Sequence, residues 1–266
     1  MGRFSIPALA RKYSVDRNII IEPVKGCGLQ CRQCTMGKLP VERKFMDPQT
    51  LDARLSELKE AGLGAHDRDL PAALLRYNVG YTSRGNPLDH ENLAQITRVV
   101  RKHLPDAKIA SFWSLDGVPS KAELVKRTKG LDLLVLSLDS HHYAGLYRAF
   151  KQTPQGMGLG PKQLREQTFD LIRDRIGWAF EAAKKNGFSI KVQITRKGKY
   201  GVPVGNEGAI FEKLVPTAKS GELGGVKMEV DSRDRRPKGN SNYMSAQSLL
   251  ILHNGEYSEA WPKPNG

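Results

Sequence analysis

The chain has 266 residues, of which 42 are Lys or Arg and 28 are Asp or Glu, so its formal net charge is +14. With 39% hydrophobic residues it is too apolar for a disordered chain, and its apolar runs are far shorter than the roughly 20 residues of a membrane span. The first residues lack the apolar core of a secretory signal, so we expect a cytoplasmic protein. All three cysteines fall between positions 27 and 34, which excludes a secreted disulfide scaffold.

Six short aliphatic runs recur along the chain and predict β-strands. Continuous apolar runs, rather than strict alternation, are typical of parallel strands that are covered on both faces. We expect these strands at Asn18–Val24, Leu75–Tyr81, Lys108–Ser114, Leu131–Leu138, Ser189–Thr195 and Val226–Val230.

The segments between these runs predict helices. Asp89 and Ser120 suit helix N-caps, and Gly62 and Gly187 suit C-caps. Alternation of strand and helix predicts βα units in a parallel α/β sheet. Six units are too few for a closed eight-stranded barrel, which leaves an open, partial barrel or a doubly wound sheet. The expected helices are Pro48–Gly62, Asp89–His103, Ser120–Thr128, Leu164–Asn186 and Glu207–Ala218.

The last third of the chain carries loops and a turn signal. Asn254-Gly255 stands between two apolar runs, Ser248–Leu252 and Tyr257–Trp261, and predicts a β-hairpin. We therefore expect a core domain over residues 1–240 and a short C-terminal hairpin extension over residues 241–266 that packs on it. Segments without apolar period predict loops at Lys151–Lys162, Arg196–Gly208 and Arg233–Asn242.

Cys27, Cys31 and Cys34 form a C-x3-C-x2-C motif directly after the first expected strand. Three thiolates in one short loop can converge on a metal centre, and thiolates favour zinc, copper(I) and iron–sulfur clusters. A structural zinc site usually has four protein ligands, but the chain has no fourth cysteine and no histidine nearer than His66. A four-iron cluster on three cysteines keeps one iron open for another ligand. A zinc site and an incidental cysteine trio are the alternatives.

The motif, its place after the first strand and the six βα units resemble the radical S-adenosylmethionine (SAM) superfamily. The resemblance extends over most of residues 18–240 and implies a partial (β/α)6 TIM-like barrel. It implies that the three cysteines hold a [4Fe–4S] cluster, that SAM binds the open iron, and that one electron cleaves SAM to methionine and a 5′-deoxyadenosyl radical, which abstracts hydrogen from a substrate. The C-terminal hairpin resembles the SPASM or Twitch extensions but has no cysteine, which excludes an auxiliary cluster.

Gly85-Asn86-Pro87, after the second strand, is similar to the family's Gly-Gly-Glu-Pro segment, which receives the SAM amino group. Asn86 stands where the family carries Glu. An amide oxygen can accept the same hydrogen bond but without charge assistance, a loss of about 1 kcal/mol. The alternative is that these residues form only a turn.

Polar residues at the ends of the later strands extend the resemblance, because the loops of a parallel α/β barrel meet at that edge. Ser137, Asp139 and Arg148 resemble the family's pattern near the SAM ribose and carboxylate. Gln33 departs from the family, which carries an aromatic residue near the adenine. The SAM contacts that the resemblance implies are Gln33, Gly85, Asn86, Pro87, Ser114, Ser137, Asp139, Arg148, Gln193, Thr195 and Met228.

The net charge of +14 indicates an anionic partner. An acidic flavodoxin or ferredoxin that delivers the electron, an acidic peptide and RNA are the candidates. Aromatic residues make up only 7% of the chain and no RNA-binding module is present, so a peptide or protein side chain is favoured over a nucleoside or RNA as substrate. A non-catalytic protein that uses an iron–sulfur cluster or zinc as a structural or sensing element is the alternative from another class.

Overall fold

The structure is a computed structural model that describes residues 5–16, 18–29, 41–63, 77–81, 85–195, 221–223, 226–233 and 248–258. At residues 15–16, 138–141, 194–195, 221–223 and 227–233 it describes the backbone alone. Cys31, Gln33 and Cys34, the helix expected at Glu207–Ala218, the loop expected at Arg196–Gly208 and most of the one at Arg233–Asn242 lie outside these ranges. Within the described ranges, no helix combines the length and apolarity needed to cross a membrane.

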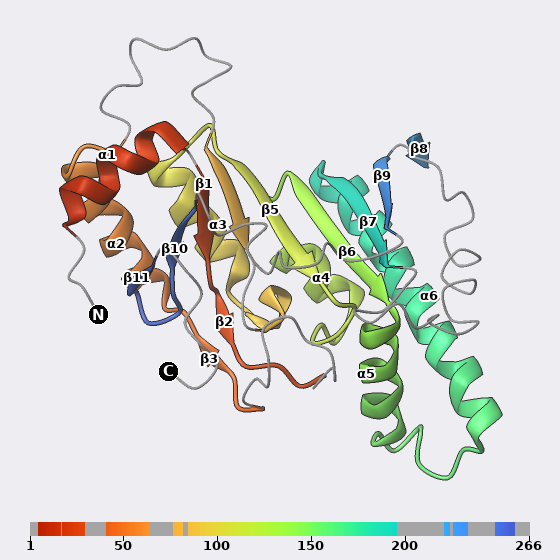
Figure 1. The fold of residues 1–266 in the computed structure, drawn as a ribbon. Helices are drawn as coiled ribbons and strands as arrows, with labels where there is room; N and C mark the ends of the chain where they lie inside the picture. Colours follow the sequence, from red (N-terminus) through yellow and green to blue (C-terminus); the bar gives the residue numbers. More distant parts are fainter. Residues whose placement is uncertain are drawn as a thin grey trace.

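Nine of the described strands form one large sheet, which is parallel except at its two edges (Figure 1). Six parallel strands follow one another in chain order, and all six coincide with the runs expected from the sequence. They are β1 (Asn18–Ile21), β4 (Asn78–Tyr81), β5 (Lys108–Trp113), β6 (Leu133–Asp139), β7 (Ser189–Thr195) and β9 (Val226–Arg233). The predicted α/β class with a parallel sheet is therefore confirmed.

The edges of the sheet are built from short strands. β8 (Gly221–Leu223) pairs antiparallel with β9 at one edge. At the other edge β10 (Leu249–Ile251) runs parallel to β1, and β11 (Tyr257–Ser258) pairs antiparallel with β10. The predicted hairpin thus forms, and it belongs to the main sheet. The proposed domain boundary at residue 240 lies outside the described residues.

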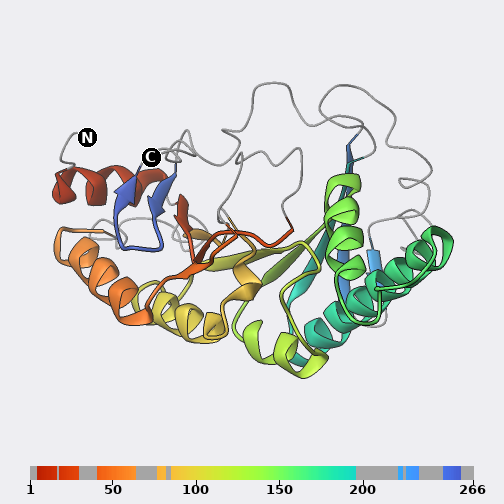
Figure 2. The same ribbon diagram turned by 90° about the horizontal axis from the view of Figure 1, so that it is seen from below.

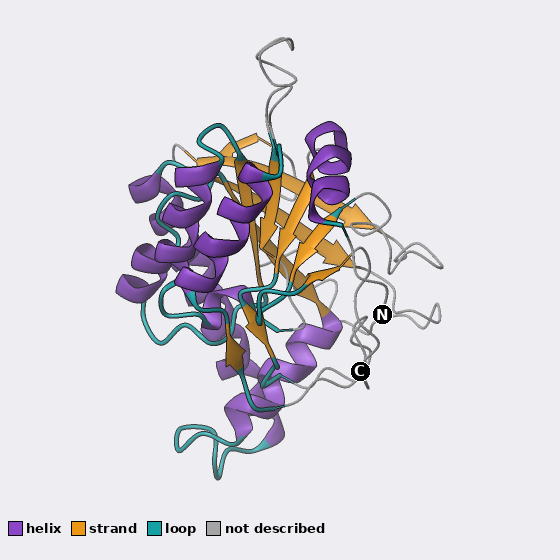
Figure 3. Cartoon of the chain, turned by 90° about the vertical axis from the view of Figure 1, so that its left-hand side faces the viewer, coloured by secondary structure: helices purple, strands orange, loops and turns teal. Residues whose placement is uncertain are grey.

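Most helices follow a strand and gather on one side of the sheet, as Figure 3 shows, whereas α1 (Ile6–Asp16), which precedes β1, lies apart from this layer (Figure 2). Figure 2 shows α2 (Pro48–Glu60), α3 (Leu93–His103), α4 (Lys121–Arg127) and α6 (Pro161–Asn186) succeeding one another along this face in an arc. Helix α3 is typical: its buried side chains Leu93, Ile96 and Val100 lie on one helical face that packs into the core. A further helix, α5 (Ser140–Lys151), follows β6 directly.

The helix ends confirm some of the expected caps and correct others. The Ser120 hydroxyl accepts a hydrogen bond from the Glu123 amide and caps α4, and Gly187 ends α6 in the left-handed conformation, with φ of 77°. The expectation for Asp89 was wrong. It ends a short 3-10 helix, η3 (Pro87–Asp89), and α3 begins only after Asn92.

Candidate functional site

The segments that carry the cysteines, Asn86 and Ser114 all leave the sheet at the carboxyl-terminal end of its parallel strands, here called the carboxyl edge. The cysteine segment follows β1, Gly85-Asn86-Pro87 follows β4, and Ser114 and Asp116 follow β5. Because these strands are parallel and adjacent, the segments that leave them lie at the same edge. Figure 1 shows α5 leaving the end of β6 at this same edge.

A small antiparallel ribbon, β2 (Val24–Lys25) paired with β3 (Lys44–Phe45), flanks the cysteine segment. Cys27 lies just after β2 and is partly buried against the core. Gly26 must be glycine here, because its φ is +109° and an added Cβ would lie 2.1 Å from the Glu42 carbonyl oxygen. Cys31 and Cys34 lie outside the described residues, and within the part of the chain that the structure describes no three His, Cys, Asp or Glu side chains form a metal site.

The cysteine segment and the Gly85-Asn86-Pro87 segment are joined through their backbones. Gly26 and Gly85 form a parallel β-bridge. The approach requires glycine at position 85, since a Cβ there would lie 2.3 Å from the Gly26 carbonyl oxygen and 3.2 Å from that of Val24. The residue before Cys27 is thereby held beside the residue before Asn86.

Asn86 is 4% exposed and uses only half of its hydrogen-bonding capacity within the described part of the molecule. Its Nδ2 donates to Asp89 Oδ1 at 2.8 Å and to the Asp116 carbonyl oxygen at 2.7 Å. Its Oδ1 is buried and has no hydrogen-bond partner there. A buried polar atom without a partner is costly, so an unsatisfied acceptor in a native fold calls for a donor from a ligand or water.

Asp89 was not identified as a site residue from the sequence. Its Oδ2 lies 2.7 Å from the Arg43 Nε, and its side chain is 3% exposed. Burial raises the pKa of Asp89 to about 6, and the neighbouring carboxylate of Asp116 adds to the rise, while Arg43, the Asn86 hydrogen bond and Arg127 oppose it. No pattern in the sequence pairs position 43 with position 89.

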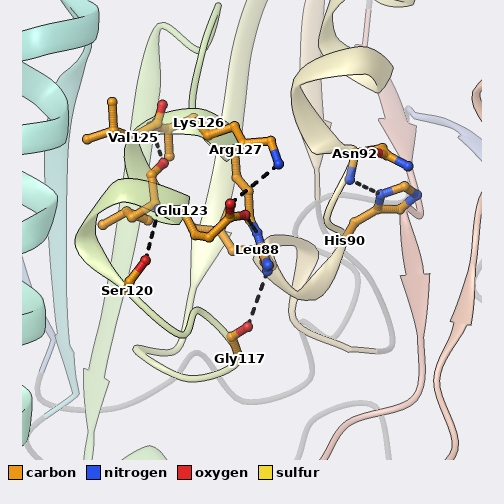
Figure 4. Close-up of polar contacts among 11 residues, drawn as sticks. Leu88, His90, Asn92, Gly117, Ser120, Glu123, Val125, Lys126 and Arg127 are labelled. Atoms are coloured by element: carbon orange, nitrogen blue, oxygen red, sulfur yellow. Dashed lines mark hydrogen bonds and ion pairs between the residues drawn. The ribbon is translucent and has the colours of Figure 1, made fainter.

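Arg127 holds the loops after β4 and β5 together. It is 4% exposed, and from α4 it donates to the carbonyl oxygens of Leu88, at 2.7 Å, and Gly117, at 3.2 Å (Figure 4). Its Nε also donates to Glu123 on the same helix, at 3.2 Å. This arginine stabilises the backbone from which Asn86 and Asp116 project.

His90 joins the loop after β4 to the ribbon beside the cysteine segment. Its Nδ1 accepts a hydrogen bond from the Asn92 amide, so its Nε2 carries the proton and donates to the Met46 carbonyl oxygen at 2.7 Å (Figure 4 shows the first of these bonds). Burial lowers the pKa of His90, which favours this neutral form. Phe45 packs edge-on against the ring.

The loop after β5 is strained and is fixed by α6. Leu115 has a φ of 61°, which is unfavourable for a residue with a side chain. Arg175 donates to the Leu115 carbonyl oxygen, and its Nη1 lies 3.7 Å from Asp116 Oδ1. Ser114, an expected SAM contact, is partly buried at the start of this loop.

Arg148 reaches from α5 to the cysteine segment, where its Nη2 donates to the Leu29 carbonyl oxygen at 3.4 Å. The other expected contacts lie on the paired strands β6, β7 and β9. Ser137 is opposite Gln193, and Asp139 is opposite Thr195, at the carboxyl end of both strands. Met228 is opposite Ile190, near the start of β7 and away from that end.

Comparison with protein-family models and with curated proteins gave no match. Among solved structures, 14 chains match. One is the crystal structure of BtrN in complex with AdoMet and 2-DOIA, with 12% sequence identity and a TM-score of 0.43. The alignment covers 94% of this chain and 74% of that chain. A likeness of this degree says nothing about the residues of the site.

Proposed function

We propose that this chain is a radical SAM enzyme. In this proposal Cys27, Cys31 and Cys34 hold a [4Fe–4S] cluster, and SAM binds at the carboxyl edge of a partial (β/α)6 barrel. The observation that carries the proposal is the bridge between Gly26 and Gly85, which joins the cysteine segment to a segment whose buried acceptor, Asn86 Oδ1, has no partner among the described residues. The chain order of the six parallel strands supports the barrel.

The residues fit both cofactors. Three thiolates are suitable iron ligands and match a cluster with one open iron. The buried Oδ1 of Asn86 is an acceptor without a partner among the described residues, and the SAM amino group is a cationic donor. The expected contacts Ser114, Ser137, Asp139, Arg148, Gln193 and Thr195 would supply donors and acceptors for the SAM carboxylate and ribose.

When bound, the reduced cluster would supply one electron that cleaves the sulfonium of SAM to methionine and a 5′-deoxyadenosyl radical, which takes a hydrogen atom from the substrate. The chain's own residues bind SAM and orient it. In this proposal Asn86 Oδ1 accepts a hydrogen bond from the amino group, and Gly85 permits the close approach of the cysteine segment. Arg127 fixes the loop that carries both residues to the loop after β5.

We propose a peptide or protein side chain as the substrate class. The Ser137–Asp139 segment and the cysteine-free hairpin resemble the branch of the superfamily that modifies peptides, and few aromatic side chains are present for stacking on bases. The two substrate classes are separated by incubating the SAM-loaded protein with co-purifying peptide or RNA and finding which one changes mass.

We also propose that an acidic flavodoxin or ferredoxin delivers the electron at the ribbon beside the cysteines. Lys25 and Lys44 stand opposite each other in this ribbon, and Lys44 and the aromatic Phe45 are exposed. Basic side chains around an electron-entry point attract an acidic partner and speed encounter.

Anaerobic reconstitution tests the proposal. We expect a brown protein with about four irons per chain, which releases 5′-deoxyadenosine when supplied with dithionite and SAM. Cys27→Ala, Cys31→Ala or Cys34→Ala should each abolish both the colour and the nucleoside. A colourless zinc protein would contradict the cluster, and an intact cluster without SAM cleavage would favour a sensor.

A further inference from the structure

The Asn86 amide has only one orientation that its surroundings tolerate. The two groups around its Nδ2, Asp89 Oδ1 and the Asp116 carbonyl oxygen, are both acceptors. If the amide were turned by 180°, its oxygen would face these two oxygens, and both hydrogen bonds would be lost to repulsion. The amide is therefore held with Oδ1 directed away from Asp89 and Asp116.

Asp89 is the acidic member of this arrangement, and both oxygens of its carboxylate have partners. Oδ1 receives the amide hydrogen of Asn86, and Oδ2 pairs with Arg43, from the ribbon that flanks the cysteine segment. Gly117 leaves room for this carboxylate, because an added Cβ at position 117 would lie 1.4 Å from Asp89 Oδ1. The carboxylate is thus fixed by its neighbours on three segments of the chain.

We propose that Asp89 is a positioning residue that fixes the Asn86 amide so that its oxygen is presented to the cationic amino group of SAM. The inference rests on the proposed function. A neutral amide could otherwise meet either a donor or an acceptor by rotating, and the Asp89 carboxylate, together with the Asp116 carbonyl oxygen, removes that freedom. Asp89 thereby selects for a ligand that donates at this point, although it does not touch the ligand itself.

The experiment compares two ligands on the reconstituted protein by anaerobic equilibrium dialysis. SAM carries the amino group, whereas 5′-methylthioadenosine carries the adenosine and sulfur without the amino acid part. For Asp89→Leu we expect the Kd of SAM to rise about tenfold and that of 5′-methylthioadenosine to change less than twofold, with iron content unchanged. Glu91→Gln, which removes an exposed negative charge from the same loop, is the matched control and should alter neither Kd.

A second pair of variants applies if Asp89→Leu does not fold. Asn86→Asp restores the family's carboxylate but sets it against Asp89, so we expect weaker SAM binding than in the wild type. Asn86→Asp combined with Asp89→Asn should recover part of that loss, because the amide introduced at position 89 can donate to the new carboxylate.

The outcomes separate the two proposals. Equal effects of Asp89→Leu on both ligands, or on neither, overturn the positioning role and leave the proposed function standing. An Asn86→Asp protein that binds SAM as tightly as the wild type would also overturn the positioning role of Asp89. A wild-type protein that loads no cluster and binds no SAM overturns the proposed function and this inference together.

Discussion

At the scale of single residues, glycine at position 85 is required by the backbone of its neighbours. Gly85→Ala would place a methyl group 2.3 Å from the Gly26 carbonyl oxygen, which is backbone and cannot rotate aside. We expect the free energy of unfolding to fall by roughly 1–3 kcal/mol and iron incorporation to drop. Urea unfolding of the cluster-free protein and iron analysis measure the two effects.

Gly177 provides a matched control for that substitution. It lies within α6, and nothing lies within 4 Å of an added Cβ. Gly177→Ala should raise the free energy of unfolding by about 0.5–1 kcal/mol, because alanine loses less backbone entropy than glycine in a helix. If both alanines acted alike, the close approach at Gly85 would not be the cause of its effect.

Asp89 makes stability depend on pH in an identifiable direction. Its pKa is raised from 3.8 to about 6 in the folded protein, chiefly by burial. Between these two values the folded chain holds a proton that the unfolded chain has released, so the contribution of Asp89 to stability is largest at low pH and falls as pH rises through about 4 to 6.

Asp89→Asn lacks this titration and isolates it. Between pH 5 and pH 7 the free energy of unfolding of the wild type should fall relative to that of Asp89→Asn by about 1 kcal/mol. Urea unfolding at pH 5, 6 and 7 measures the difference. A difference between the two proteins that is independent of pH would show that Asp89 has an ordinary pKa in the folded state.

At the scale of elements, the hairpin is tied to the end of β1 by hydrogen bonds between Glu22 and His253. Glu22, which follows β1 and is 0% exposed, lies 2.9 Å from the Nδ1 of His253 and also accepts from the His253 amide at 3.3 Å. His253→Ala removes the imidazole partner of the buried Glu22 side chain, so we expect the free energy of unfolding to fall by about 2 kcal/mol.

Thermal unfolding of His253→Ala against the wild type checks this prediction. Glu256→Gln, which changes an exposed side chain in the same turn, is the control and should leave the midpoint unchanged. A His253→Ala protein as stable as this control would mean that the contact with Glu22 contributes nothing to holding the hairpin.

The elements themselves were largely predictable, because burial on both faces leaves a continuous apolar run. All six core strands were found from such runs, and β7 has the expected bounds. Helix α5 was missed because Ser140 follows β6 directly, with no loop to separate the two patterns. The cap expected at Asp89 was wrong because its carboxylate pairs with Arg43 and Asn86 instead.

The candidate site was predictable only in outline. The order of strands brings the cysteine segment and Gly85-Asn86-Pro87 to one edge, which the sequence indicates. The supporting residues Arg43, Asp89 and Arg127 come from segments far apart in the chain and have no spacing in common. Such long-range contacts depend on packing, which a pattern of residue types along the chain does not encode.

At the scale of the whole molecule, the net charge of +14 predicts how an acidic electron donor would react with the chain. Steering by charge weakens as salt screens it, since the Debye length falls from roughly 14 to 6 Å between 0.05 and 0.3 M salt. We expect the second-order rate of cluster reduction by an acidic flavodoxin to fall severalfold over this range.

The location of the charge, and not only its sum, can be tested. Lys44 is exposed on the ribbon beside the cysteine segment. Lys184 is exposed near the end of α6, close to the amino-terminal end of the parallel strands, where β7 begins. Lys44→Glu and Lys184→Glu change the net charge equally. Stopped-flow reduction at low salt should be slowed severalfold by Lys44→Glu and little by Lys184→Glu, because local charge governs the encounter complex. Equal slowing by both variants would place electron entry elsewhere on the surface.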